Sequence, residues 1–307
     1  TTSAGAFLNA WVDFNNNGVF TDAGEQVMSN GGVAAGSSGS TVNVGFTVPA
    51  GAVTGVSTGL RVRLTADSSP GVGGSGGVGE VEDYVVTLAA PTTDLGDYSL
   101  FADAGSTRNS SLRLGALTDV EYASTRNAAA TGDDLTGSDD EDGVTLPAMT
   151  AGAPATIPVV VSNTTGAPAY LNAWIDYNNN GVLTDAGEQV AANVAVATGV
   201  SNSTLNLGIT VPATALTGVN LGVRFRLTTT SSPGPTGLSG SGEVEDYVVN
   251  IAAPTTDYGD FSGFADASQG ANPALRLGAQ LDPEYASTRN STATGDDSTG
   301  VDDEDGV

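Results

Sequence analysis

The sequence contains no lysine, no histidine and no cysteine, and each absence excludes a kind of chemistry. Without cysteine the chain forms no disulfide, and without histidine or cysteine it lacks the usual ligands of zinc and copper. The lack of lysine excludes Schiff-base catalysis, the phosphate-binding lysine of P-loops and lysine isopeptide crosslinks. No Ser-His-Asp or Cys-His arrangement can be built either. We therefore expect a protein that is not an enzyme.

Positive charge is also scarce. Nine arginines face 35 acidic residues, which gives a formal net charge of −26. Such a surface repels nucleic acid and anionic lipid and attracts cations, so we expect no nucleic-acid partner. No stretch approaches the roughly 20 apolar residues of a membrane span, so we expect no insertion into a membrane.

The chain is one unit written almost twice. Trp11 recurs as Trp174 and Glu80 as Glu243, an offset of 163 that holds from Thr1 and Thr164 to Val144 and Val307. An internal repeat of this kind predicts that the chain folds as two similar structural units. Segment 145–163 occurs once, between the copies, and resembles the opening strands of a repeat. The first copy thus lacks its opening strands here. We expect a window on a longer array, or a fibre subunit that copies of itself complete head to tail by adding a strand.

Short runs of alternating or β-branched residues, separated by Gly, Ser, Asn and Pro, predict five to seven strands per repeat. This pattern is typical of an all-β sandwich, immunoglobulin-like or jelly-roll-like. The expected strands are Ala6–Asp13, Thr41–Val48, Gly59–Thr65, Val81–Ala89, Thr156–Val161, Ala169–Asp176, Thr204–Val211 and Val244–Ala252. The expected domains are repeat 1 (residues 1–90), an acidic linker (91–144), repeat 2 (145–253) and a second acidic linker (254–307).

The loop DFNNNGVFTDAGEQ, repeated as DYNNNGVLTDAGEQ, predicts a calcium site. Its oxygens follow the spacing of a calcium loop, with Gly18 at the tight turn, but the usual glutamate at position 12 is replaced by Gly24. The alternative is a plain Asn/Gly turn between strands. The expected ligands are Asp13, Asn15, Asn17, Val19, Asp22 and Glu25, with Asp176, Asn178, Asn180, Val182, Asp185 and Glu188.

The acidic linkers are a second candidate for calcium. Calcium takes six to eight oxygens, and these segments crowd carboxylates that few arginines can balance. The alternative is a solvated acidic run. The expected ligands are Asp94, Asp97, Asp133, Asp134, Asp139, Asp140, Glu141 and Asp142, with Asp257, Asp260, Asp296, Asp297, Asp302, Asp303, Glu304 and Asp305.

The motif GEVEDY occurs at Gly79–Tyr84 and Gly242–Tyr247. We expect Glu82 or Asp83 to pair with Arg61 or Arg63 on a neighbouring strand, and the second copy to do the same, because bidentate Arg–carboxylate pairs commonly have this structural role. The same carboxylates could reach the calcium loop. A glycosidase-type carboxylate pair is the weaker alternative.

GEVEDY, the WxDxNxNG loop and the run ending in DDEDGV resemble the GEVED domain family and its associated repeats. The resemblance covers nearly the whole chain. It implies a β-sandwich module of large secreted or cell-surface bacterial proteins. We expect an extracellular structural protein in which calcium stiffens the repeats of a filament, stalk or surface layer. The alternative is a calcium-dependent adhesin or carbohydrate-binding module, which binds surface glycans through exposed aromatics such as Tyr98, Phe101 and Tyr122.

Overall fold

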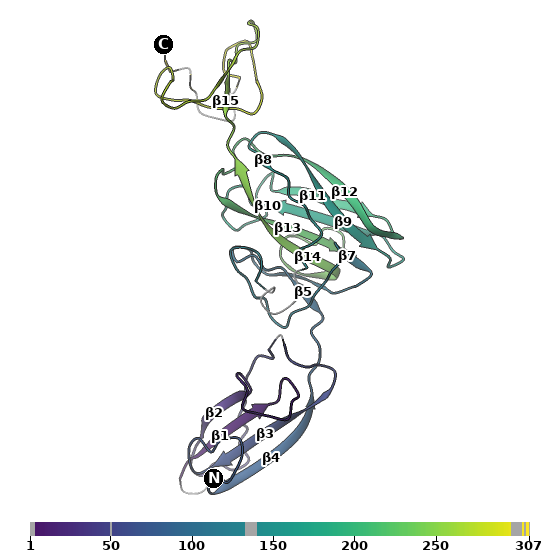
Figure 1. Cartoon of the computed structure of the whole chain (residues 1–307), viewed down its shortest axis with the longest axis vertical. Helices are drawn as coiled ribbons and strands as arrows, with labels where there is room; N and C mark the ends of the chain where they lie inside the picture. The colour runs from purple at the N-terminus through teal and green to yellow at the C-terminus, as the bar shows by residue number, and fades with distance from the viewer. Residues whose placement is uncertain (1–3, 50, 133–139, 296–302, 304, 307) are drawn as a thin grey trace. The chain divides into compact units, whose positions relative to one another are not determined.

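The computed structural model describes residues 4–49, 51–132, 140–295, 303 and 305–306 (Figure 1). All regular secondary structure in these residues is β-strand, which confirms the predicted all-β class. No helix capable of spanning a membrane occurs in the described part of the chain. The chain divides into two compact units, Thr1–Thr92 and Thr93–Val307.

The first unit contains one antiparallel sheet in the strand order β2-β1-β3-β4. Its strands are β1 (Ala6–Val12), β2 (Gln26–Val33), β3 (Ser57–Thr65) and β4 (Gly79–Thr87). The buried apolar cluster of this sheet is small and consists of Val12, Phe14 and Leu88. The GEVEDY strand, β4, is exposed along most of its length.

The second unit contains the same four strands and several more. The shared strands are β10 (Ala169–Ile175), β11 (Gln189–Val196), β13 (Asn220–Thr228) and β14 (Gly237–Ala252). They form part of a seven-stranded sheet in the order β11-β10-β13-β14-β6-β5, in which β8 also pairs with β14. The added strands are β5 (Thr93–Leu95), β6 (Ala104–Thr107) and β8 (Met149–Thr150).

A second sheet of this unit has the order β12-β9-β7. Its strands are β7 (Leu112–Leu114), β9 (Pro154–Asn163) and β12 (Val200–Thr210). Both sheets contribute to one hydrophobic core: Ile157 and Val159 come from β9, Leu207 from β12, Phe225 from β13 and Ile251 from β14. The strands β15 (Thr256–Tyr258) and β16 (Ser268–Gly270) form a separate two-stranded sheet.

One strand prediction is wrong. Residues 41–48 form no strand, although their copy lies in β12. β12 pairs along its length with β9, where Leu207 faces Ile157. In the described part of the first unit, no strand corresponding to β9 lies beside residues 41–48. An alternating pattern of apolar residues is not enough to form a strand, because the backbone N–H and C=O groups also need a neighbouring strand as hydrogen-bond partner.

The GEVEDY strands of the two units also differ in length. β14 begins at Gly237, five positions earlier than β4 would predict from the repeat offset. The additional residues pair in parallel with β6, with Gly237 opposite Ala104 and Ser239 opposite Ser106. The acidic segment therefore extends the strand that follows it in the sequence.

Candidate functional site

The loop after the tryptophan strand folds in the same way in both repeats. Asp176 accepts hydrogen bonds from the backbone N–H groups of Asn180 (3.1 Å) and Gly181 (2.8 Å). Oδ1 of Asn178 and of Asn180 each accepts a backbone N–H two residues ahead, as in an Asx turn. The same bonds are made in the first copy by Asp13, Asn15 and Asn17.

The amide nitrogens of these asparagines hold a third predicted ligand. Nδ2 of Asn178 and Nδ2 of Asn180 each lie 2.8 Å from Oδ2 of Asp185, and these bonds lower the pKa of that exposed carboxyl. Asn15 and Asn17 bind Asp22 in the same way and lower its pKa. The loop is thus closed by its own side chains. Val19 and Val182, the predicted carbonyl ligands, are exposed.

The glutamate at the end of the loop is buried and short of partners. Glu188 is 2% exposed, and neither carboxylate oxygen makes a hydrogen bond of good geometry. Burial raises its pKa to about 7, and the charges of Asp176 and Asp185 add to the rise, although the nearby backbone of Asn178 and Tyr177 opposes it. In the first copy, Oε1 of Glu25 accepts the Phe14 N–H at 3.1 Å while Oε2 has no partner. Buried, unpaired carboxylate oxygens next to a second carboxylate fit a divalent cation.

The acidic segments are held by bonds from carboxylates to backbone N–H groups. Asp97 accepts from Gly132 at 2.7 Å, Asp140 from Asp119 at 2.8 Å and Asp142 from Ala116 at 2.9 Å. The C-terminal copy makes the corresponding bonds through Asp260, Asp303 and Asp305. Hydrogen bonds to the charged form of a carboxylate stabilise it, so these bonds help to order a segment with few cationic side chains.

The first acidic segment wraps around β14. Along the edge of the strand, β6 pairs with its first residues. On one face Glu243 accepts the Leu114 N–H, and Oε1 of Glu245 accepts the Gly143 N–H at 2.9 Å. On the other face Asp246 accepts the Tyr98 N–H at 3.0 Å. A segment that looked like a linker is therefore packed on the sheet that follows it.

An ion pair anchors this contact. Arg224 and Asp246 form two parallel hydrogen bonds of 2.7 Å, and both side chains are fully buried. The guanidinium also donates to the carbonyl of Ala102 at 2.8 Å and lies 5.0 Å from the ring centre of Phe101. The prediction that a motif carboxylate pairs with a neighbouring arginine is confirmed, and the aspartate is the partner. In the first unit Arg61 and Asp83 form the same pair at the surface.

The second arginine of each strand has another role. Nη1 of Arg226 donates to the Gly234 carbonyl at 2.9 Å, and its Nη2 donates to the Gly105 carbonyl at 2.8 Å. Burial lowers its pKa to about 10. Arg63 binds only carbonyls of its own turn, among them that of Gly71 at 2.9 Å. Arg226 thus ties β13 to the acidic segment.

Four carboxylates gather where the segment meets β14. Burial raises the pKa of Asp94 well above its usual range, and the charge of Asp140 raises it further. Burial also raises the pKa values of Glu243 and Glu245, which lie near the same two aspartates. Asp94 accepts the Val244 N–H at 2.7 Å, whereas Oε1 of Glu243 has no partner. Among the described residues, no group of three or more acidic side chains is arranged as a ready-made metal site.

The structure thus brings Asp94 together with Asp140, while Asp97 binds elsewhere. Glu243 and Glu245, which we did not predict as members of this cluster, belong to it. The sequence signal that could have found them is their spacing of two residues, which places both side chains on the same face of one strand. Asp142 is exposed, Glu141 and Asp257 are half-buried, and seven of the predicted ligands lie outside the described residues. These seven are Asp133, Asp134, Asp139, Asp296, Asp297, Asp302 and Glu304.

The aromatic residues of the segment point inward. Tyr98 and Phe101 are buried and pack edge to face at 4.9 Å, in a cluster with Trp174 and Leu183. A Cβ added to Gly222 would lie 2.4 Å from both rings, so this glycine makes room for them. Tyr122 is half-buried. These aromatics hold the segment on the sheet.

The fold and site define a tandem-repeat all-β protein whose motif strand is a platform for an acidic segment. The GEVED domain model matches residues 7–87 and 170–250, together more than half of the chain. The chain belongs to the GEVED domain family, as the sequence predicted. A search of curated proteins found no match.

Proposed function

We propose that this chain is a non-enzymatic, extracellular structural protein. Its tandem β-sandwich repeats, stiffened by calcium, would build a filament, stalk or surface layer. The observation that carries the proposal is the packing of the first acidic segment, in its described residues 93–132 and 140–144, on both faces and the edge of β14. A segment that is built into the second repeat fits a stiff array better than a free linker would. The core shared by both sheets of the second unit supports the sandwich architecture.

Calcium would bind first at the loops. Asp176 and Glu188 supply carboxylates, and the unpaired oxygens of Glu188 gain a partner when a cation binds. Asp13 and Glu25 offer the same groups in the first repeat. A second position is the cluster of Asp94 and Asp140 beside β14. When bound, the ion neutralises carboxylates that otherwise repel one another, and this adds to the stability of the fold.

The experiment is thermal unfolding of the full chain with calcium and with a chelator. We expect calcium to raise the melting temperature and the chelator to lower it. At about 100 times the dissociation constant, one site adds about 2.7 kcal/mol. The variant Glu188→Gln should reduce the calcium effect, whereas Glu82→Gln, on the exposed β4, should leave it unchanged. A melting temperature that is the same with calcium and chelator contradicts calcium stiffening.

The structural role itself is tested by imaging the native particle, and we expect filaments or sheets. Isolated molecules at high concentration would contradict it. The adhesin alternative relied on exposed aromatics such as Tyr98, Phe101 and Tyr122. Tyr98 and Phe101 are buried and Tyr122 is half-buried, so we do not propose sugar binding at this place.

A further inference from the structure

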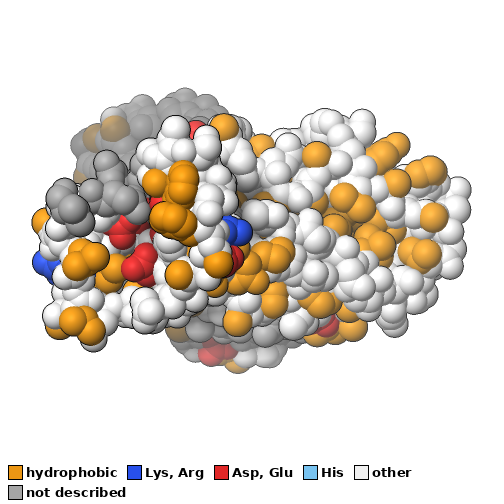
Figure 2. Space-filling model, turned by 90° about the horizontal axis from the view of Figure 1, so that it is seen from above, with side chains coloured by type: hydrophobic (Ala, Val, Ile, Leu, Met, Phe, Trp, Pro, Cys, Tyr) orange, Lys and Arg blue, Asp and Glu red, His pale blue; other side chains and the backbone are white. Residues whose placement is uncertain are grey.

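In the second acidic segment, three of the apolar residues that are buried in the first segment recur as exposed residues. Leu112 and Leu114 are fully buried at 0%, whereas their copies Leu275 and Leu277 are 81% and 76% exposed. Phe101 is 1% exposed and its copy, Phe264, is 73% exposed. Hydrophobic and acidic side chains lie exposed on one face of the molecule in Figure 2. Large apolar side chains that are exposed here and buried in the other copy are a mark of an interaction surface.

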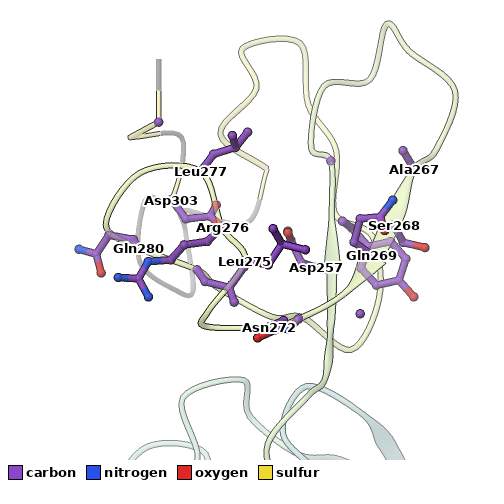
Figure 3. A pocket seen from close by; sticks show the side chains of 16 residues that line it. Asp257, Ala267, Ser268, Gln269, Asn272, Leu275, Arg276, Leu277, Gln280 and Asp303 are labelled. Atoms are coloured by element: carbon purple, nitrogen blue, oxygen red, sulfur yellow. The ribbon is translucent and has the colours of Figure 1, made fainter.

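Leu275 and Leu277 border an open groove. The groove has a volume of about 660 Å³, and its lining includes Asp257, Ser268, Gln269, Leu275 and Leu277. Figure 3 shows the side chains of Leu275 and Asp257 between the strand of Ser268 and Gln269 and the loop of Leu277. In the first segment, the counterparts of these lining residues pair with β14 and β9. The groove is therefore the side of the segment that receives a GEVED strand.

The matching strand surface is uncovered in the first unit. Val81, Tyr84 and Val85 of β4 are exposed, whereas Val244 of β14 is buried. The motif letters of the two strands are identical over residues 79–86 and 242–249. The arginine and glycine that receive Phe101 in the second unit, Arg224 and Gly222, recur here as Arg61 and Gly59.

We propose that the groove lined by Asp257, Ser268 and Leu277 binds β4 of a second copy of this chain. The contact deepens the proposed function, on which it rests, because it names the surfaces through which copies would join. β16 would pair in parallel with residues 74–78, as β6 pairs with the start of β14. Phe264 would lie on Gly59 beside Arg61. Leu277 would lie beside Glu80, as Leu114 lies beside Glu243.

One residue on the β4 face stands in the way. The ring of Phe20 lies 5.6 Å from the Arg61 guanidinium, and a Cβ on Gly59 would lie 3.1 Å from it. Phe20 thus covers Arg61 and Gly59. In the second unit, the counterparts of these two residues contact Phe101. Its copy there is Leu183, which leaves that place open. Docking of Phe264 therefore displaces Phe20.

The register gives a direct test by disulfide crosslinking. Leu238 pairs with Gly105 in the second unit, so Ser75 would pair with Ser268 of another copy. The chain has no cysteine, so Ser75→Cys and Ser268→Cys each add the only thiol, and any mixed disulfide is intermolecular. Paired positions of adjacent strands are within the range a disulfide can bridge. We expect the mixture of the two full-length variants to form the heterodimer at least tenfold faster than a mixture of Ser69→Cys with Ser268→Cys.

Two further variants test the chemistry by sedimentation. The double variant Leu275→Asp and Leu277→Asp should abolish concentration-dependent association. Both side chains are exposed, so their replacement leaves the fold intact. Leu216→Asp, an exposed leucine outside the groove, should associate as the unmodified chain does. Phe20→Leu should strengthen association several-fold because the ring no longer has to move.

Equal crosslinking of the matched and control cysteine pairs would overturn the proposal. So would a crosslink that forms only within a chain carrying both cysteines, because the groove would then bind its own first unit. If calcium does not change the melting temperature but Ser75→Cys and Ser268→Cys crosslink, calcium stiffening is wrong and the docking proposal holds. If calcium stabilises the chain but the pair does not crosslink, the docking alone is wrong.

Discussion

The GEVEDY aspartate occurs once in a buried ion pair and once in an exposed one, and this permits an internally controlled experiment. Asp246 and its partner Arg224 are fully buried, whereas the side chains of Asp83 and Arg61 are 58% and 29% exposed. Both pairs have the same 2.7 Å bidentate geometry. The substitution Asp→Asn at each position therefore changes the same bond in two environments.

We expect the two substitutions to differ by several kcal/mol. Asp246→Asn leaves the Arg224 charge buried without a counter-charge and weakens the bond to the Tyr98 N–H. Removing one partner of a buried pair costs about 3–5 kcal/mol. Asp83→Asn leaves Arg61 free to be solvated, and exposed pairs contribute about 0.2–1 kcal/mol.

Each unit carries one tryptophan, which makes the measurement selective. Trp174 packs against Tyr98 and Phe101 in the second unit, and Trp11 is buried in the first. Urea unfolding of Asp246→Asn is followed by fluorescence in a Trp11→Phe background, and that of Asp83→Asn in a Trp174→Phe background. With a slope of about 1–3 kcal/mol per M, the first midpoint should fall by about 1 M or more. Equal shifts in the two units would refute the argument that burial sets the cost.

Two further predictions use the same comparison of repeats. Gly222→Ala should cost about 1–3 kcal/mol and increase protease cleavage of residues 93–144, because its Cβ would lie 2.4 Å from Phe101, and Gly59→Ala should cost less. Burial raises the pKa of Glu243, so the folded state holds this proton more tightly than the unfolded state. Its contribution to stability is present below about pH 4.5 and is lost as the pH rises through the raised value. The measurement is the urea midpoint at pH 4.5 and at pH 7 in the presence of a chelator. The difference between the two midpoints should be smaller in Glu243→Gln than in the unmodified chain. Glu80→Gln, on the exposed strand β4, should leave this difference unchanged. Equal pH dependence of stability in the unmodified chain and in Glu243→Gln would contradict the argument.

The strands and loops of the fold were largely readable from the sequence. Alternating apolar residues such as Leu60, Val62 and Leu64 predicted β3, and the Asn/Gly loop after each tryptophan strand was predicted as a closed turn or an ion site. The Arg–Asp pair was predictable because facing strands placed opposite charges together. These are local or near-local signals, which a single sequence carries well.

Contacts between distant segments could not be predicted. Glu243 accepts the Leu114 N–H across 129 residues, and Tyr98 reaches Asp246 across 148. The composition of residues 91–144 indicated a linker, because its acids outnumber its arginines. Backbone N–H groups supply many of the hydrogen-bond partners of these carboxylates instead, and the amino-acid composition carries no information about them. Residues 41–48 failed as a strand for a related reason, since a strand needs a partner and the described part of the first unit has no counterpart of β9.

The C-terminal acidic segment keeps its shape while its binding groove stays open. Gly295 binds Asp260 and Ala279 binds Asp305, as Gly132 binds Asp97 and Ala116 binds Asp142 where the segment is covered. The conformational entropy of this segment is therefore lost during its own folding, before any partner arrives. A preorganised surface loses less of its interaction energy to ordering, so two such chains would meet with their contact surfaces already formed. The proposed association would then require only collision and the rotation of single side chains such as Phe20, without a folding step to slow it.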